Sequence, residues 1–491
     1  MNISIRTGSV ALFCLFSLTF ATGCNRLQTG YIFERGIQEE KAGNWAAATS
    51  DFTEVIRLDP RNSPAYVDRA IAERRLKEYD EAMRDYNRAL EINPKDDHAY
   101  SGRGFTKIDE DEFEGGAMDF LNAIQLNRTN AQAYYGMGVA DSYLTNFDDA
   151  IANFTRDIEL GDNSSTVYSY RGRAKYEIGD NDGAMADYDE AVKLSATDFF
   201  AYVYRGEAKE KKGDFDGAIA DYARTIEIDP KNELSYEHRG HVEQKKGDYE
   251  GAIADYDEAI ELNPLDNVAY EYRGLAKYKR GDINGALADY DKAIEVEPKN
   301  YAAFVNRGLA RSKMGDLEGA INDYDQAIEI NPKDNAVYDN RSMAKERNGD
   351  LSGAIIDINK SIELNPTNST AYNIRGWIEF VKNDFDSSIA DANHAIQLDP
   401  QNGDAYGTRG WARYGKGDVS GAVEDCKIAV KFHQLNSVEY FYDQGMLDFI
   451  AEDYGEAISD WSKIIQQDAA SKSELQPWID KAQAKLQEKK P

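Results

Sequence analysis

Apolar and polar positions recur along the chain with a period of 34 residues. Each period holds two stretches in which apolar residues have helical spacing, joined by a short turn. In one copy the second stretch contributes Ala252, Tyr256, Ala259 and Ile260. Prolines that close the second stretch fall at positions 60, 94, 230, 264, 298, 332, 366 and 400. A fixed period of this length predicts a solenoid of helix pairs.

Aligned on this period, the sequence reads close to A-Y-x-x-R-G-x-A-x-x-x-x-G-D-x-x-G-A-I-A-D-Y-x-x-A-I-E-x-x-P. This pattern resembles the tetratricopeptide repeat, with aromatic residues at repeat positions 4 and 24, small residues at 8, 20 and 27, and proline at 32. Twelve copies follow in register from residue 29, and a thirteenth follows a one-residue insertion near residue 436. The resemblance implies an all-α, right-handed solenoid of about thirteen antiparallel helix pairs over residues 29–471.

Each repeated residue type has a physical role in such a helix pair. A small residue at position 8 lets the two helices approach closely. In the turn, a glycine such as Gly213 takes the left-handed conformation that ends the first helix, and Asp214 caps the second. The end of an array needs a polar cap, and residues 472–491 fit a capping helix and tail. Their apolar stripe consists of Leu475, Ile479, Ala482 and Leu486.

A pair of opposite charges recurs within the repeats. Position 7 is arginine and position 23 is aspartate in eleven of the first twelve repeats, and both exceptions, Met137 and Asn153, lie in repeat four. Because the exceptions coincide, we expect an ion pair between the two helices of each repeat, while a pair with the next repeat is the alternative. Such pairs fix helix register and are structural rather than catalytic. Examples are Arg273 with Asp289 and Arg307 with Asp323.

Repeats eleven and twelve carry aromatic pairs at positions 9 and 12. These are Trp377 with Phe380, and Trp411 with Tyr414. In the family that the chain resembles, positions 2, 5, 9 and 12 of the first helix line a concave groove that binds peptides. The four rings are therefore candidates for a ligand-binding patch. The alternative is that they only pack between adjacent helices.

The middle of the chain departs most from the repeat. Repeats three to five lack the proline at position 32, and Asp157 stands where alanine is expected. A loop with the sequence Gly161-Asp162-Asn163-Ser164-Ser165 follows. We predict a hinge or a change of curvature near residues 157–167.

Charge, motifs and the extent of the repeats limit the classes of function that we expect. The chain has 57 Lys and Arg against 88 Asp and Glu, a net charge of −31, which disfavours nucleic-acid binding and favours a basic partner. The sequence contains no phosphate loop, nucleophile elbow or metal-protease motif. Because repeats fill almost the whole chain, we expect a protein-binding scaffold that is not an enzyme. We expect no cofactor, no metal site and no small-molecule substrate.

The N-terminus has the features of an export signal. Arg6 precedes an apolar run from Val10 to Phe20, too short for a membrane span. Residues 21–24 read Ala-Thr-Gly-Cys and resemble a bacterial lipobox, with alanine where leucine is usual. The resemblance implies cleavage after residue 23, a lipid on Cys24 and a short tether over residues 24–28.

These features predict a lipid-anchored scaffold of the bacterial cell envelope. Asn25 after the cysteine favours the outer membrane, facing the periplasm. An unanchored periplasmic or secreted binding module is the alternative. Envelope proteins of this type often assist assembly, so we expect a protein or peptide to bind in the groove.

Overall fold

The computed structural model describes residues 27–435, 437–467 and 471–488. Over these residues the chain is helical, with short connecting turns and no strand. Residues 1–23 and Cys24, with the predicted signal and lipid attachment, lie outside the described residues. None of the described helices has both the length and the apolar character needed to cross a bilayer. The chain divides into two compact units, the first ending at Asp229 and the second beginning at Pro230.

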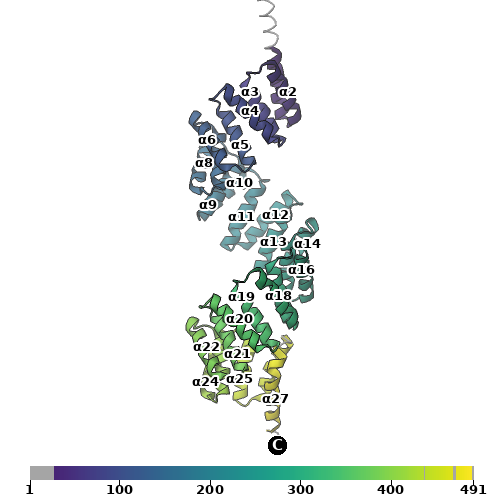
Figure 1. Ribbon diagram of the computed structural model, residues 1–491, viewed down its shortest axis with the longest axis vertical. Coiled ribbons are helices and arrows are strands. Elements are labelled where there is room, and N and C mark those ends of the chain that lie inside the picture. The colour runs from purple at the N-terminus through teal and green to yellow at the C-terminus, as the bar shows by residue number, and fades with distance from the viewer. Residues whose placement is uncertain (1–26, 436, 468–470, 489–491) are drawn as a thin grey trace, which may run out of the picture. The chain divides into compact units, whose positions relative to one another are not determined.

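The first unit is a series of antiparallel helix pairs (Figure 1). A helix over residues 27–41 forms the first pair with α2. The helices that follow are α2 (Trp45–Leu58), α3 (Ser63–Arg75), α4 (Tyr79–Ile92), α5 (Asp97–Asp109), α6 (Phe113–Leu126), α7 (Ala131–Tyr143), α8 (Phe147–Glu159), α9 (Ser165–Glu177), α10 (Asn181–Leu194), α11 (Phe199–Lys212) and α12 (Phe215–Ile228).

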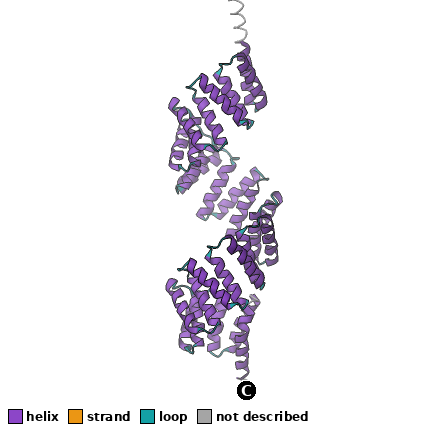
Figure 2. Cartoon of the chain, in the orientation of Figure 1, coloured by secondary structure: helices purple, strands orange, loops and turns teal. Residues whose placement is uncertain are grey.

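The second unit continues the same pattern and ends with an additional helix (Figure 2). Its helices are α13 (Glu233–Lys246), α14 (Tyr249–Leu262), α15 (Asn267–Arg280), α16 (Ile283–Val296), α17 (Tyr301–Met314), α18 (Leu317–Ile330), α19 (Asn335–Arg347), α20 (Leu351–Leu364), α21 (Ser369–Val381), α22 (Phe385–Leu398), α23 (Gly403–Gly415), α24 (Val419–Phe432), α25 (Val438–Ile450), α26 (Tyr454–Gln467) and α27 (Lys472–Glu488). The expectation of an all-α solenoid of helix pairs is confirmed.

The turns between paired helices follow the predicted Gly-Asp chemistry. Gly213 has φ 82° at the end of α11, and the Asp214 side chain accepts a hydrogen bond from the Gly217 N–H in the first turn of α12. Gly247 and Asp248 repeat this arrangement between α13 and α14. The left-handed residue ends one helix and the carboxylate satisfies an N–H of the next.

Small and aromatic residues meet at the centre of each regular repeat. Tyr324 at position 24 is buried against Gly308 at position 8, where an added Cβ atom would lie 2.6 Å from the tyrosine ring. Tyr290 and Gly274 have the same relation, at 2.7 Å. At these distances a larger residue at position 8 would require the ring or the helix to shift.

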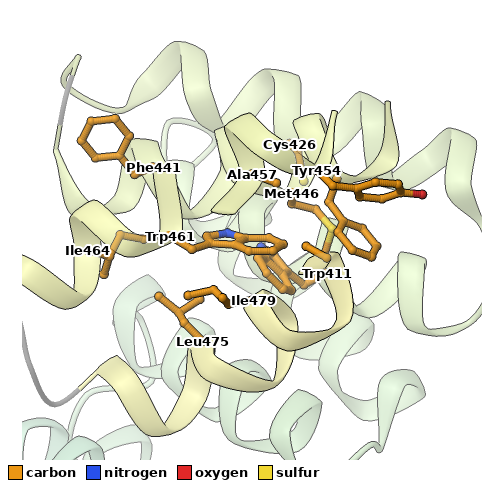
Figure 3. Close-up of a cluster of buried hydrophobic side chains, with 12 residues drawn as sticks. Trp411, Cys426, Phe441, Met446, Tyr454, Ala457, Trp461, Ile464, Leu475 and Ile479 are labelled. Carbon is orange, nitrogen blue, oxygen red and sulfur yellow. The ribbon is translucent and has the colours of Figure 1, made fainter. Parts of the chain in front are cut away.

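The last helix covers the end of the second unit. Leu475, Ile479 and Ala482 of α27 are buried in one hydrophobic cluster with Trp461 of α26. Figure 3 shows Leu475 and Ile479 rising from α27 toward the ring of Trp461. This contact removes from water an apolar surface that the thirteenth helix pair would otherwise expose.

The segment predicted as a hinge departs from the regular repeat. Helix α8 ends at Glu159, one residue earlier than most second helices, and Gly161 has φ 109°. Ser164 at the start of α9 makes no side-chain capping bond. These features describe an irregular junction, and the difference in mobility stays a prediction.

Candidate ligand groove

A groove of about 330 Å³ lies across the first helices of four successive helix pairs in the second unit. The helices are α19, α21, α23 and α25, the first members of the last four pairs. The groove is lined by apolar, aromatic and acidic side chains rather than by one chemical type. Such mixed lining suits recognition of an extended segment that carries both apolar and charged groups.

Three aromatic rings from three different helices form one side of the groove. The ring centroids of Trp377 and Trp411 are 6.2 Å apart, and that of Tyr442 lies 6.2 Å from Trp377 and 6.4 Å from Trp411. The interplanar angles of 78°, 83° and 68° are those of edge-to-face contacts, which stabilise aromatic clusters. Trp377 and Tyr442 are partly exposed, so their rings are accessible from the groove.

The structure brings the four predicted groove aromatics into one cluster, with different exposure. Trp377 contacts Phe380 and Trp411, with ring centroids 5.1 and 6.2 Å away. Trp411 is 2% exposed and forms the floor of the groove, so packing is its main contribution. Tyr414 is partly exposed but does not line the groove.

Helix α27 covers the part of the cluster that contains Tyr414. The ring of Trp478 lies 5.0 Å from Trp411 and 6.0 Å from Tyr414. It also contacts Phe449 at 5.8 Å and Trp461 at 6.2 Å. The groove therefore ends where α27 begins.

Carboxylates occupy the end of the groove formed by α23 and α25. Asp443 is buried and lies 3.2 Å from Nε2 of His433, which is 3.8 Å from Asp404. Gly407 leaves room for this carboxylate, because an added Cβ atom there would lie 2.7 Å from Asp443. Glu439 also lines this end.

Burial changes the ionisation of these groups. Burial raises the pKa of Asp443 to about 6, although the neighbouring His433 opposes the rise. Burial alone would lower the pKa of His433, but its contacts with Asp443 and Asp404 raise it overall. Burial also raises the pKa of Glu346, at the opposite end of the groove, to about 7. The carboxylates are therefore incompletely solvated and favour a cationic neighbour.

The predicted Arg and Asp residues meet in the geometry of a two-pronged ion pair. Arg273 donates to Asp289 from Nε at 3.0 Å and from Nη2 at 2.6 Å. Arg307 donates to Asp323 from Nη2 at 2.6 Å in the next repeat. A second cation reaches the same aspartates, as when Lys277 Nζ lies 2.7 Å from Asp289. This arrangement neutralises a carboxylate that is almost fully buried.

The same arginines also connect adjacent repeats. Nη1 of Arg273 donates to Asp257 of the preceding repeat at 2.6 Å, and Nη1 of Arg375 donates to Asn359 at 2.7 Å. The predicted pair thus lies within the repeat, and the additional bond of the arginine goes to a different acceptor in the preceding repeat rather than to the aspartate at position 23 of a neighbour. The acceptor lies at position 25 and is Asp, Asn or Thr where the bond forms, but the same position holds Ala223 in repeat six, so no single residue type marks it in the sequence.

Repeat four lacks the arginine, the aspartate and the position-25 acceptor of this network together. Met137 stands in place of the arginine and Leu121 stands at position 25 of the preceding repeat. Asn153, in place of the aspartate, donates a hydrogen bond to Asp141 at 2.9 Å. Asp141 occupies the position that holds Lys277 in repeat eight. In repeat four the first helix therefore supplies the acceptor and the second helix supplies the donor, the reverse of repeat eight.

Over the described ranges, no group of three or more His, Cys, Asp or Glu side chains is arranged to hold a metal ion. Cys426 is buried, and burial raises the pKa of its thiol far above the ordinary value. A thiol in this environment is a poor nucleophile.

Comparison with known families agrees with the helix-pair architecture. Family models described as TPR repeat match residues 240–279 and 274–315. Models described as tetratricopeptide repeat match residues 63–96, 171–233, 301–334 and 336–368. The chain contains tetratricopeptide repeats. Proteins built from TPRs are in general non-catalytic modules that bind other proteins.

Several solved structures are similar to this chain. The crystal structure of MamA is 28% identical and covers 32% of this chain and 93% of MamA, with a TM-score of 0.31. YrrB, described as a TPR protein with an unusual peptide-binding site, is 23% identical over 38% of this chain and 95% of its own, with a TM-score of 0.33. Yeast Tom70 is 19% identical over 87% and 96%, with a TM-score of 0.40. No curated protein matches the chain.

TPR numbering places the groove residues at a small set of repeat positions. Asp404 and Glu439 are at position 2, Tyr442 at position 5, Trp377 and Trp411 at position 9, and Glu346 at position 12. Sequence reasoning identified the tryptophans but missed the carboxylates and Tyr442. The register of repeat thirteen after the one-residue insertion already places Glu439 at position 2 and Tyr442 at position 5, but only the aromatic pairs of repeats eleven and twelve were singled out.

Proposed function

We propose that the protein is a non-catalytic scaffold that binds a segment of another protein in the groove of α19, α21, α23 and α25. The observation that carries this proposal is the groove itself, which has accessible rings of Trp377 and Tyr442 above a buried Trp411. Partly exposed aromatic residues around a packed centre are typical of residues that dominate binding energy. The acidic net charge and the carboxylates favour a basic partner.

A photocrosslinking experiment tests the groove. Asn373 lines the groove and is replaced by benzoylphenylalanine in the full chain, expressed in its native cells. The matched control places the same group at Ile356 of α20, which is 70% exposed and does not line the groove. We expect protein adducts at position 373 that Trp377→Ala removes. Equal adducts at both positions, or none at position 373, would refute binding in this groove.

We further propose that the scaffold is anchored to the bacterial cell envelope by a lipid on Cys24, most favourably at the outer membrane and facing the periplasm. The lipobox-like residues 21–24 and the apolar run before them support this. Only residues 25 and 26 separate Cys24 from the first described helix, so the start of that helix would lie within about 10 Å of the anchor. An unanchored periplasmic or secreted module is the alternative.

Palmitate labelling separates the two locations. Cells that express the full chain are fed radiolabelled palmitate, and the protein is compared with Cys24→Ser and with Cys14→Ala, which alters the other N-terminal cysteine. We expect label and membrane association in the wild type and Cys14→Ala, and loss of both in Cys24→Ser. A wild-type protein without label, recovered in the soluble periplasm, would establish the unanchored alternative.

A further inference from the structure

The end of the groove formed by α23 and α25 places carboxylates beside aromatic rings. Asp404 has a side chain that is 55% exposed, and Glu439 is exposed, so both reach solvent at the mouth. Asp443 lies below them and is paired with His433. With Glu346 at the other end, four carboxylates face the positive charges of Arg347 and, when protonated, His433. These four carboxylates outnumber the two basic side chains.

The same aromatic cluster already holds one cation from within the chain. Nζ of Lys481 lies over the rings of Trp478, Phe449 and Tyr414, at 4.8, 5.4 and 5.6 Å from their centroids. These distances are those of cation–π contacts. The rings of Trp377 and Tyr442 continue this cluster into the groove, and none of the described side chains of α27 lines the groove.

We infer that the groove takes a lysine or arginine side chain of the bound segment, which lies against the rings of Trp377 and Tyr442 with its charge facing Asp404 and Glu439. This inference rests on the proposed function and names the chemistry of the partner. The aliphatic part of such a side chain packs on aromatic rings while its charged end bonds carboxylates. An apolar side chain would bring no positive charge to Asp404 and Glu439, and an acidic one would be repelled.

Fluorine NMR of the full chain labelled with 5-fluorotryptophan tests this inference. The five tryptophans give five signals, of which that of Trp45 belongs to the first unit and serves as an internal reference. The probes are three peptides, acetyl-Gly-Ser-Ala-Leu-X-Leu-Ala-Ser-Gly-amide, in which X is lysine, arginine or the uncharged norleucine. We expect the lysine and arginine peptides to shift the Trp377 and Trp411 signals at concentrations where the norleucine peptide does not.

A pair of variants with equal charge change isolates the carboxylates. Asp404→Asn with Glu439→Gln removes two charges from the groove, while Glu258→Gln with Glu424→Gln removes two exposed charges outside it. We expect the groove variant to bind the lysine peptide roughly fivefold to tenfold more weakly, and the control variant to bind it as the wild type does. Trp377→Leu should weaken the same peptide without changing the Trp45 signal.

The outcomes distinguish this inference from the proposed function. If the norleucine peptide shifts the Trp377 signal as strongly as the lysine peptide, the groove binds segments without a preference for a cation and only this inference fails. Unchanged affinity in the groove variant would have the same meaning. If no peptide shifts the signal, the inference fails as well, while the photocrosslinking at position 373 still decides whether the groove binds protein.

Discussion

Arg273 shows how one residue serves both a repeat and the junction to its neighbour. Its guanidinium donates to Asp289 in its own repeat and to Asp257 in the preceding one. Lys277 also contacts Asp289, so this buried carboxylate has two cationic partners. A planar group with five donors can satisfy two acceptors in fixed directions, which an ammonium group cannot. The recurrence of arginine at position 7 follows from this double role.

Loss of both cations should cost more than the sum of the single losses. In the Arg273→Met variant, Lys277 still neutralises Asp289. In the Lys277→Met variant, Arg273 still neutralises it. Only the double variant leaves the carboxylate buried without a cation, at a cost of about 3 kcal/mol or more. Hydrogen exchange of the amides in α15 and α16 measures this locally, because long arrays do not unfold in one step.

The control for this cycle is Lys279→Met, which removes an exposed lysine from the same helix. Combined with Arg273→Met it should give additive effects, since the two side chains have no common partner in the proposed network. Additive losses in the Arg273 and Lys277 pair would show that the second cation does not contribute to the neutralisation of Asp289.

The glycine at position 8 sets the distance between paired helices. Gly308→Ala would place a Cβ atom 2.6 Å from the buried ring of Tyr324, so the ring or the helix must shift. We expect a loss of about 1–3 kcal/mol, measured by exchange in α17 and α18. Gly30→Ala, where nothing lies within 4 Å of the added atom, is the control and should be neutral or stabilising. A neutral Gly308→Ala would show that Tyr324 can move without cost.

At the scale of helices, one buried acid lies at the irregular junction between α8 and α9. Asp157 is 1% exposed, and neither of its oxygens has a hydrogen-bond partner among the described residues. It stands at position 27, where most repeats have alanine. Burial, and then the nearby Asp162, raise its pKa from 3.8 to about 7. The folded junction therefore holds a proton that the unfolded chain releases at lower pH.

Asp157→Ala should stabilise this junction, and more so at high pH. Because the folded-state pKa lies above the unfolded value, stability is full below about pH 4 and falls as the pH rises to about 7. We expect exchange in α8 and α9, corrected for the intrinsic rate, to slow several-fold in the variant at pH 8 and to change little at pH 4. Asp157→Asn keeps the shape and should remove the pH dependence. A wild-type junction with equal protection at both pH values would contradict the assignment.

The apolar pattern of α27 predicted the helix but not all of its contacts. Its apolar stripe predicted a helix that caps the array, and Leu475, Ile479 and Ala482 are indeed buried. The stripe did not reveal that Trp478 reaches back two repeats to Trp411 and Tyr414. That contact depends on the direction in which α27 crosses α26, which the spacing of residues along one helix does not determine. The same contact decides which of the predicted groove aromatics remain accessible.

At the scale of the whole molecule, the period of 34 residues was sufficient to predict most of the fold. Each repeat buries its apolar face on its neighbours, so one pattern predicts every helix pair and its turn. The groove was less predictable, because its residues come from four repeats and include types that vary at each position. Trp377 and Trp411 were visible as unusual residues at a recurring position. Asp404 and Tyr442 were not, since each is an ordinary residue whose role follows only from its neighbours in space.

The net charge of −31 predicts how the whole array responds to salt. Repulsion among excess carboxylates opposes a compact chain, and salt screens such exposed charges over about 10 Å at 0.1 M. The paired carboxylates, such as Asp289, are buried and are screened less. We therefore expect the thermal unfolding midpoint, followed by circular dichroism, to rise by several degrees between 0.02 and 0.2 M sodium chloride. Glu258→Gln with Glu424→Gln, which removes two exposed charges, should raise the low-salt midpoint and reduce the gain from salt. A midpoint that falls with salt would instead mean that attraction between exposed ion pairs outweighs the repulsion of the excess negative charge.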